Sequence, residues 1–128
     1  MIVIVCGSRS FSDYLTAAEI STLLQQAIDA SGFHITKVIS GGARGIDNAA
    51  IRWAILNNVP YYVERATKSD WMRHGRGGGN IRNLRMADLQ PPPQACLAIW
   101  DGQSNGTIDM LTIMRDRGRQ WYLHTHKL

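Results

Sequence analysis

The sequence has few of the features that mark secreted, membrane or disordered proteins. Only two cysteines, Cys6 and Cys96, occur in 128 residues. Both lie in predicted buried strands, which indicates free thiols in a reducing cytoplasm rather than a disulfide framework. No apolar run is long enough to cross a bilayer, and the chain begins with a predicted strand, without the basic lead of a signal peptide. With 19% charged and 45% hydrophobic residues, the composition is typical of a folded globular domain.

Acidic residues are outnumbered by basic ones. The 14 Lys and Arg against 10 Asp and Glu give a net charge of +4, which favours anionic partners without choosing between a nucleotide, a nucleic acid and an acidic protein. Much of the excess falls in one stretch that contains Arg65, Lys68, Arg73, Arg76, Arg82 and Arg85. Because glycines are interleaved with these residues, a binding surface explains the stretch better than an ordinary solvated face.

Short apolar runs alternate with helical patterns along the chain. The runs predict strands at 2–6, 36–40, 61–63, 95–100 and 121–124. Apolar residues at helical spacing predict helices at 16–30, 44–57, 81–87 and 105–117. We expect residues 69–80 to form a loop and the three prolines at 91–93 to form a connector.

This alternation predicts an α/β fold, a single Rossmann-like domain over residues 1–128. A five-stranded, mostly parallel sheet would be covered by helices on both faces in three layers, through right-handed crossovers. The strand order 3-2-1-4-5 is our prediction, and the flavodoxin-type order 2-1-3-4-5 is the alternative. Either order places a ligand beyond the carboxyl ends of the strands.

Three glycine-bearing loops follow predicted strands at that edge. The first contains Gly7, Ser8 and Arg9. A glycine directly after a buried strand allows the chain to turn and expose N–H groups to an anion. Ser8 can donate a hydrogen bond, and Arg9 supplies a fixed charge for a phosphate or carboxylate. A simple turn with a surface ion pair is the alternative.

The second loop runs from Ser40 to Asp47 and opens a helix. It includes three glycines within five residues, the candidate binding residues being Gly41, Gly42, Ala43, Arg44 and Asp47. Such a loop lets an anion approach the N–H groups of a helix start. Asp47 is favoured there by the helix dipole and could also accept from ribose hydroxyls. The spacing is neither that of a dinucleotide fingerprint nor that of a P-loop.

The third loop follows the strand at 95–100 and opens the helix at 105–117. Its candidate binding residues are Asp101, Ser104, Gly106 and Thr107. Gly106 and Thr107 are placed to offer N–H and hydroxyl donors. A plain helix cap from Ser104 is the alternative, although one cap does not require two glycines.

A basic, glycine-rich segment precedes the predicted helix at 81–87. We interpret residues 71–80 as a flexible flap, followed by a helix whose first turn faces the ligand. Arg82 and Arg85 are three residues apart and share a helix face, while Asn83 lies on a flank. A solvated connecting loop is the alternative.

The remaining aromatic and histidine residues favour structural roles. We expect Trp53, Trp100 and Trp121 to pack in the core rather than stack on bases, and His34 to lie at the surface. His124 and His126 share a strand face, but two histidines without a third ligand make a poor metal site. The sequence therefore predicts neither a metal site nor a cofactor.

Four ordered motifs resemble a known family. They are the Gly-Ser-Arg triplet after the first strand, residues 40–47, the series from Trp71 through Arg82-Asn83 to Met86, and residues 101–107. Together they resemble the YspA-like family of the SLOG superfamily, from about Ile2 to Met114. That superfamily has a Rossmann-like fold and binds nucleotides or nucleotide-derived signals. The resemblance implies ligand-binding roles for Gly7, Ser8, Arg9, Gly41, Gly42, Arg44, Arg82, Gly106 and Thr107.

Two related families supply alternatives. Arg82-Asn83 and residues 102–107 are similar to motifs of the LOG-type phosphoribohydrolases, which release a base from a nucleoside monophosphate. However, Met110 stands where their catalytic glutamate is expected, so Asp109 and Arg82 are the remaining catalytic candidates. Asn83 and Asp101 also replace a lysine and a proline of those motifs, and one residue is extra. The DNA-processing DprA proteins, which bind single-stranded DNA, share the first two motifs, over the first half of the chain.

We therefore expect a domain that binds a phosphate-bearing nucleotide or nucleotide-derived ligand. It would act as a sensor, a sequestering protein or a weak nucleotide-processing enzyme. The alternatives are a nucleotide N-glycosidic hydrolase and a single-stranded DNA-binding protein, with weak DNA binding at most being our expectation. We also expect a cytoplasmic homo-oligomer without a membrane partner.

Overall fold

The computed structural model describes residues 1–128, apart from the side chain of Arg76. The strands are β1 (Ile2–Gly7), β2 (Lys37–Ser40), β3 (Tyr61–Val63), β4 (Ala95–Trp100) and β5 (Gln120–Thr125). The helices are α1 (Phe11–Tyr14), α2 (Ala17–Ser31), α3 (Ile46–Leu56), α4 (Lys68–His74), the 3₁₀ turn η1 (Gly75–Gly77), α5 (Gly78–Ala87) and α6 (Asn105–Asp116).

The five strands form one parallel sheet in the order β3-β2-β1-β4-β5. This confirms the predicted order and excludes the flavodoxin-type alternative. β1 lies at the centre, where Ile4 pairs with Ile39 of β2 and with Cys96 of β4. The order reverses direction between β1 and β4, and such a switch point leaves a crevice at the carboxyl ends of these two strands.

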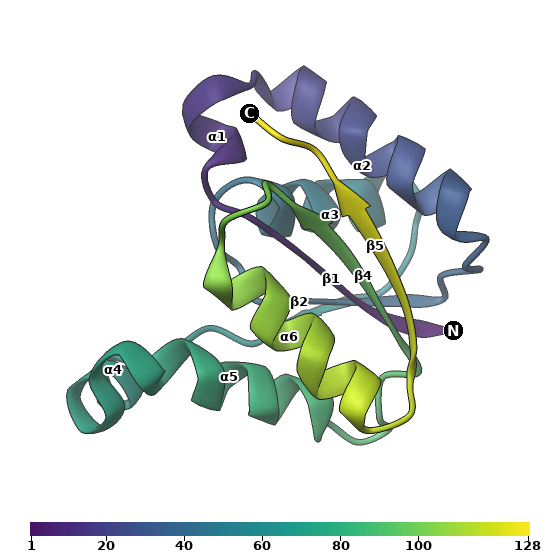
Figure 1. Cartoon of the computed structure of the whole chain (residues 1–128). Coiled ribbons are helices and arrows are strands. Elements are labelled where there is room, and N and C mark those ends of the chain that lie inside the picture. The colour runs from purple at the N-terminus through teal and green to yellow at the C-terminus, as the bar shows by residue number, and fades with distance from the viewer.

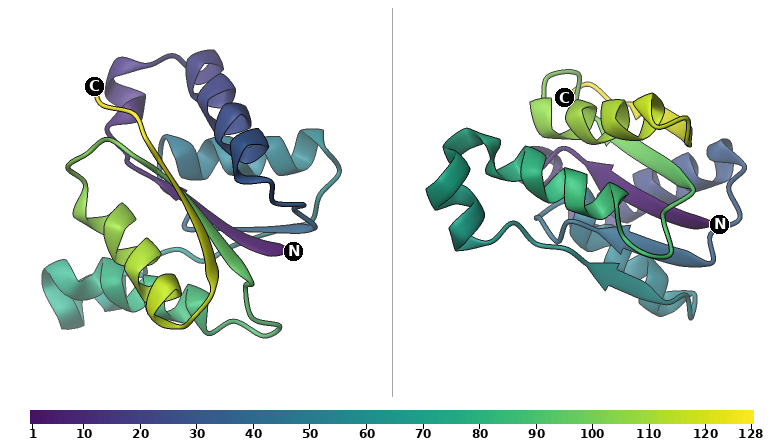
Figure 2. Two further views of the ribbon diagram at one scale, coloured as in Figure 1. Left: turned by 45° about the vertical axis from the view of Figure 1, so that its right-hand side comes forward. Right: turned by 90° about the horizontal axis from the view of Figure 1, so that it is seen from below.

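Helices cover both faces of the sheet, as Figures 1 and 2 show. On one face, α2 and α3 bury side chains such as Leu24 and Ala50 against Val5 and Leu97. On the other face, α5 and α6 bury Met86 and Met110, among others, against Ile4, Ile39 and Ala98. The strands are therefore apolar on both faces, which explains why they appear in the sequence as continuous apolar runs.

Gly7 allows α3 to pack closely on the end of β1. A Cβ at this position would overlap the Ile46 side chain in the first turn of α3. Since Ile46 is fully buried, it has no free space into which to move. The first glycine of the three loops is therefore needed for helix–strand packing as well as for the turn.

The prediction of a loop at 69–80 is wrong, because most of this segment is helical. Thr67 and Asp70 form a capping box that starts α4: the Thr67 side chain accepts from the Asp70 N–H, and the Asp70 carboxylate accepts from the Thr67 N–H. The glycines that suggested a loop lie in η1 and in the first turn of α5. The flexible flap is therefore replaced by an arm of short helices, hereafter the α4–α5 arm (residues 68–87), which projects at one end of the molecule (Figure 1).

The aromatic side chains are less buried than the sequence suggests. Trp121 lies on the edge strand β5 and is 50% exposed, so the prediction that it packs in the core is wrong. Trp53 and Trp100 are partly buried, and their indole N–H groups donate to Gln25 Oε1 and to the Ser104 carbonyl. His34 is exposed and the two cysteines are buried and free, as predicted. None of the described helices is both long and apolar enough to span a membrane.

The close approach at Gly7 can be tested by measuring stability. We expect Gly7→Ala to lower the free energy of unfolding by about 1–3 kcal/mol, the usual cost of overpacking a core. Gly106→Ala is the matched control, because a Cβ at Gly106 meets nothing within 4 Å. Urea unfolding of both variants gives the two free energies. A Gly7→Ala variant as stable as the control would contradict the packing role.

Candidate ligand-binding site

A cavity of about 750 Å³ opens at the carboxyl ends of β1, β2 and β4. All three predicted loops contribute to it, and the α4–α5 arm forms the wall on the far side. Its lining residues are Cys6, Gly7, Arg9, Gly41, Gly42, Ala43, Asp47, Arg65, Ala66, Trp71, Gly79, Asn80, Arg82, Asn83, Met86, Ser104, Asn105, Gly106, Thr107, Asp109 and Met110. The volume lies in the range of small-molecule sites.

Arg82 connects the arm to the second glycine loop. Its Nη1 donates to the Gly41 carbonyl at 2.9 Å, and its Nε donates to Asn83 Oδ1 at 3.0 Å. A Cβ at Gly41 would overlap the Arg82 guanidinium, so the glycine makes room for this contact. Arg65 approaches the same loop from the segment that follows β3, and its Nη1 donates to the Gly42 carbonyl at 2.6 Å. Two guanidinium groups thus lie on the cavity wall above the glycines.

Asn83 and Asn80 hold a carboxylate on the opposite wall. The Asn83 amide donates to Asp109 Oδ2 and the Asn80 amide donates to Asp109 Oδ1, each at 2.8 Å. Because Asn83 Oδ1 accepts from Arg82, the orientation of its amide is fixed. The residue expected on a helix flank is therefore buried at the centre of a network from Gly41 to Asp109. Met110, in contrast, is 1% exposed and packs in the apolar layer under α6.

Asp47 places a buried carboxylate at the base of the cavity. Its Oδ2 accepts from the Ala43 N–H at 3.2 Å, and Oδ1 has no hydrogen-bond partner among the described residues. Burial raises the pKa of Asp47 to about 6, although the Ala43 N–H and the Arg82 charge act in the opposite direction. A buried acceptor without a partner is costly for a folded chain and is a common feature of ligand sites.

Three of the predicted binding residues lie outside the cavity lining. Ser8 is fully buried, and its hydroxyl accepts from the Asp101 N–H at 3.1 Å. Asp101 accepts hydrogen bonds from Ser10 and from the N–H groups of Gln103 and Ser104. These bonds outweigh the effect of burial and lower the pKa of Asp101 to about 2. Ser8 and Asp101 therefore hold the third loop in its conformation through hydrogen bonds and do not face the cavity.

Arg44 also points away from the cavity. Its Nε donates to Ser12 Oγ at 3.1 Å, and its Nη2 pairs with Asp13 at 3.4 Å near α1. The remaining predicted residues, namely Gly7, Arg9, Gly41, Gly42, Ala43, Asp47, Arg82, Asn83, Ser104, Gly106 and Thr107, all line it.

Several lining residues were not among the predicted binding residues. Trp71 and Asn80 belong to the segment for which the sequence predicts a loop, and Arg65 stands out in the sequence only by its charge. The repeated Asn and Arg residues at 80, 82 and 83 were the available signal, because helical spacing brings residues 80 and 83 to one face. Only the tertiary structure shows that this face meets Asp109.

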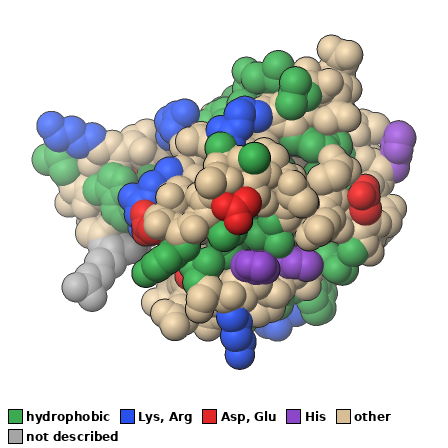
Figure 3. Space-filling model, turned by 90° about the horizontal axis from the view of Figure 1, so that it is seen from above, with side chains coloured by type: hydrophobic (Ala, Val, Ile, Leu, Met, Phe, Trp, Pro, Cys, Tyr) green, Lys and Arg blue, Asp and Glu red, His purple; other side chains and the backbone are tan. Residues whose placement is uncertain are grey.

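Arg85 has a different role from Arg82, although the sequence places both on one helix face. Its Nη1 and Nη2 donate to the two carboxylate oxygens of Asp70, and its Nε donates to Glu64, all at 2.8 Å. These hydrogen bonds, together with that from the Thr67 N–H, hold the pKa of Asp70 well below its usual range. Arg85 therefore fastens the α4–α5 arm to the segment after β3. Figure 3 shows Lys and Arg side chains beside hydrophobic ones at the end of the molecule where α4 lies.

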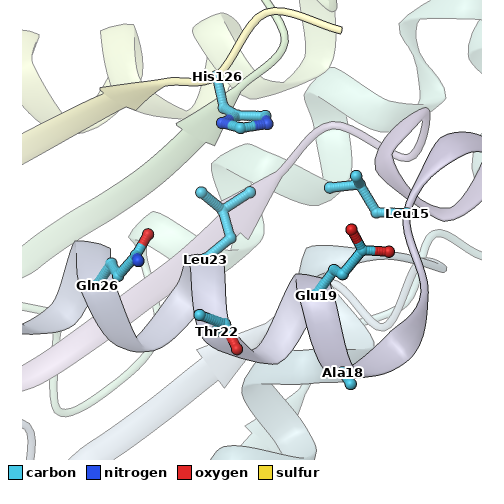
Figure 4. Close-up of a pocket in the computed structure, with 7 residues that line it drawn as sticks. All are labelled: Leu15, Ala18, Glu19, Thr22, Leu23, Gln26 and His126. Carbon is cyan, nitrogen blue, oxygen red and sulfur yellow. The ribbon is translucent and has the colours of Figure 1, made fainter.

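A smaller hollow of about 330 Å³ lies between α2 and the segment after β5 (Figure 4). It is lined by Leu15, Ala18, Glu19, Thr22, Leu23, Gln26 and His126. Among the described residues, those that line this hollow include Glu19 but no Lys or Arg. The hollow is therefore less suited to an anion than the large cavity.

The Asp47 carboxylate predicts an unusual dependence of stability on pH. Between its usual pKa of 3.8 and about 6, the folded chain holds a proton that the unfolded chain has lost. Stability is therefore lost as the pH rises through this range, by about 3 kcal/mol at most. We expect Asp47→Asn to gain stability relative to the wild-type chain between about pH 4 and about pH 6.5. Chemical denaturation of both chains at a series of pH values measures the difference. If the difference in free energy of unfolding between the two chains does not change with pH, the pKa of Asp47 is not raised by burial.

Comparisons with known proteins agree with the sequence motifs and the fold. Residues 1–74 match the model of the YspA, cpYpsA-related SLOG family. The Gene 61 protein of Mycobacterium phage D29 is 34% identical over 110 residues, which cover 82% of this chain and 81% of that protein. DNA processing protein A (DprA) from Streptococcus pneumoniae has a similar structure, with a TM-score of 0.62 at 18% identity. That match covers 94% of this chain but only 49% of the DprA chain, so this chain spans about half its length and shares its fold. The resemblance inferred from the motifs is thus confirmed, and the chain belongs to the YspA-related SLOG family.

Proposed function

We propose that the large cavity binds a phosphate-bearing nucleotide or nucleotide-derived ligand. The observation that carries this proposal is the meeting of three glycine loops and three arginines, Arg9, Arg65 and Arg82, around one cavity. Family membership and the DprA-like fold support a role related to nucleotides or DNA in general. We propose that residues 1–128 form one binding domain that acts as a sensor, a sequestering protein or a weak nucleotide-processing enzyme.

The charges within the cavity suggest how such a ligand would be oriented. The first turn of α6 brings the N–H groups near Gly106 and Thr107 to the wall, and a helix N-terminus favours a phosphate. Asp47 and Asp109 would repel a phosphate but can accept from sugar hydroxyls or base N–H groups. The phosphate is therefore best placed among the arginines and the α6 terminus, with the hydroxyl groups of the sugar directed toward Asp47 or Asp109.

Arg82 is the cation whose removal tests this site. We expect Arg82→Ala to weaken nucleotide binding by about 1.5–3 kcal/mol, the contribution of a charge-assisted hydrogen bond. Arg44→Ala is the matched control, since Arg44 belongs to the adjacent loop but pairs with Asp13 outside the cavity. Calorimetric titration with nucleoside monophosphates and ADP-ribose measures the affinities. Thermal shift checks them, since a ligand at a hundred times its Kd adds about 2.7 kcal/mol.

Three results would argue against this proposal. The absence of binding by every phosphate-bearing compound, also at low salt, would exclude it. An equal loss of affinity in Arg44→Ala and Arg82→Ala would show that the cavity is not the site. Sub-micromolar binding of a single-stranded oligonucleotide would favour the DNA-binding alternative. In that case the logarithm of the binding constant should fall with the logarithm of the salt concentration, with a slope of about −0.7 per neutralised phosphate.

A nucleotide N-glycosidic hydrolase is a second candidate, and the position of Asp109 favours it. The carboxylate lies on the cavity wall and is held by two amides, as a group that stabilises a sugar cation or orients a water must be. However, each oxygen already accepts a hydrogen bond, and the position that matches the glutamate of the hydrolases is the buried Met110.

We therefore expect binding without efficient hydrolysis. Incubation of the purified protein with nucleoside monophosphates should release little free base, which chromatography would detect. Rapid release that Asp109→Asn abolishes would establish the hydrolase instead. Asp101→Asn serves as the control, because Asp101 lies outside the cavity lining and caps the third loop.

A further inference from the structure

Trp71 is one of several aromatic side chains that the folded chain leaves about half exposed. It lies on α4, lines the large cavity and is 48% exposed. Figures 1 and 2 show α4 at the tip of the α4–α5 arm, away from the sheet and the glycine loops. A half-exposed indole leaves apolar surface in water, and the fold does not gain the free energy of burying that surface. The position of Trp71 on a cavity wall therefore calls for a partner.

The glycines after Trp71 form a seat for its indole ring. A Cβ at Gly78 would lie 2.7 Å from Trp71 Cε3 and 3.0 Å from Cδ2, and one at Gly79 would lie 3.7 Å from Cη2. The ring thus lies across the backbone at the start of α5. Gly77 and Gly78 have φ angles of −75° and −59°, which any residue can adopt. Gly78 is therefore needed because it has no side chain that would overlap the indole ring, and not because its backbone adopts an unusual conformation.

The seat is held in place before any ligand arrives. Asp70, the residue before Trp71, is bound by both Nη atoms of Arg85 and by the Thr67 N–H. These bonds fix the backbone that carries Trp71, and its ring rests against the glycine backbone of α5. A platform that is ordered in advance loses little conformational entropy when a ligand binds.

We propose that Trp71 is the stacking platform for the base of the ligand, and so determines that the site takes a base-bearing nucleotide rather than a phosphate or sugar phosphate alone. This inference rests on the proposed function. The arginines and the α6 terminus would hold the phosphate near the sheet, and the indole would hold a flat aromatic ring under the arm. Stacking tolerates every base because each has an aromatic face.

The test compares ligands with and without a base. Affinities of the wild-type chain, Trp71→Ala and Trp71→Phe are measured by calorimetry for the four ribonucleoside monophosphates and for ribose phosphate. We expect Trp71→Ala to bind the nucleotides about tenfold or more weakly, with ribose phosphate unaffected and Trp71→Phe close to wild type. Trp121→Ala is the matched control, because Trp121 is exposed to the same extent but lies on β5, outside the cavity lining.

Tryptophan emission gives a second measurement that does not depend on the stability of the alanine variant. Nucleotide binding should quench the wild-type emission, and Trp71→Phe should bind with much less quenching, since Trp53, Trp100 and Trp121 lie outside the cavity lining. Equal losses for nucleotides and ribose phosphate, unchanged nucleotide affinity in Trp71→Ala, or full quenching in Trp71→Phe would overturn the inference. If no nucleotide binds the wild-type chain, the proposed function itself fails.

Discussion

Arg85 on α5 joins α4 to the segment that follows β3. It binds Asp70 on α4 and Glu64 after β3 at the same time, through three hydrogen bonds of 2.8 Å. The α4–α5 arm is the outer wall of the cavity, so these bonds help to hold that wall opposite the glycine loops. They fix Asp70, the residue before Trp71, whereas the α5 residues that reach Gly41 and Asp109 are also positioned by the packing of α5 on α6 and the sheet.

The cavity contains charges of both signs and is not uniformly basic. At the second glycine loop, Arg82 donates to the Gly41 carbonyl and lies close to the buried Asp47 carboxylate. Arg65 binds the same loop, and Asp109 is held by two amides on the opposite wall. A uniformly basic pocket would bind any anion, whereas a pocket with charges of both signs discriminates against ligands that carry negative charge alone. The overall charge of +4 therefore describes the surface better than it describes the site.

The sheet could be predicted from the sequence because buried parallel strands are continuous apolar runs bounded by glycines, as at Ile2–Gly7 and Ala95–Trp100. The glycine loops could be predicted to meet because parallel strands end at one edge. The α4–α5 arm could not, since glycines normally interrupt helices and Gly78 is explained only by its contact with Trp71. Likewise, nothing local distinguishes Arg82, which reaches the cavity, from Arg85, which pairs with Asp70.

Asp47 shows how the demands of the cavity and of the fold diverge. The carboxylate is 5% exposed and one of its oxygens has no partner in the described part of the chain. Natural proteins commonly keep such strained groups where activity needs them, at a cost in stability. Directed evolution for thermostability alone would therefore replace Asp47 early. The heat-resistant variants would have a cavity without this carboxylate. Position 47 is therefore where selection for stability and selection for the charge of the cavity would favour different residues.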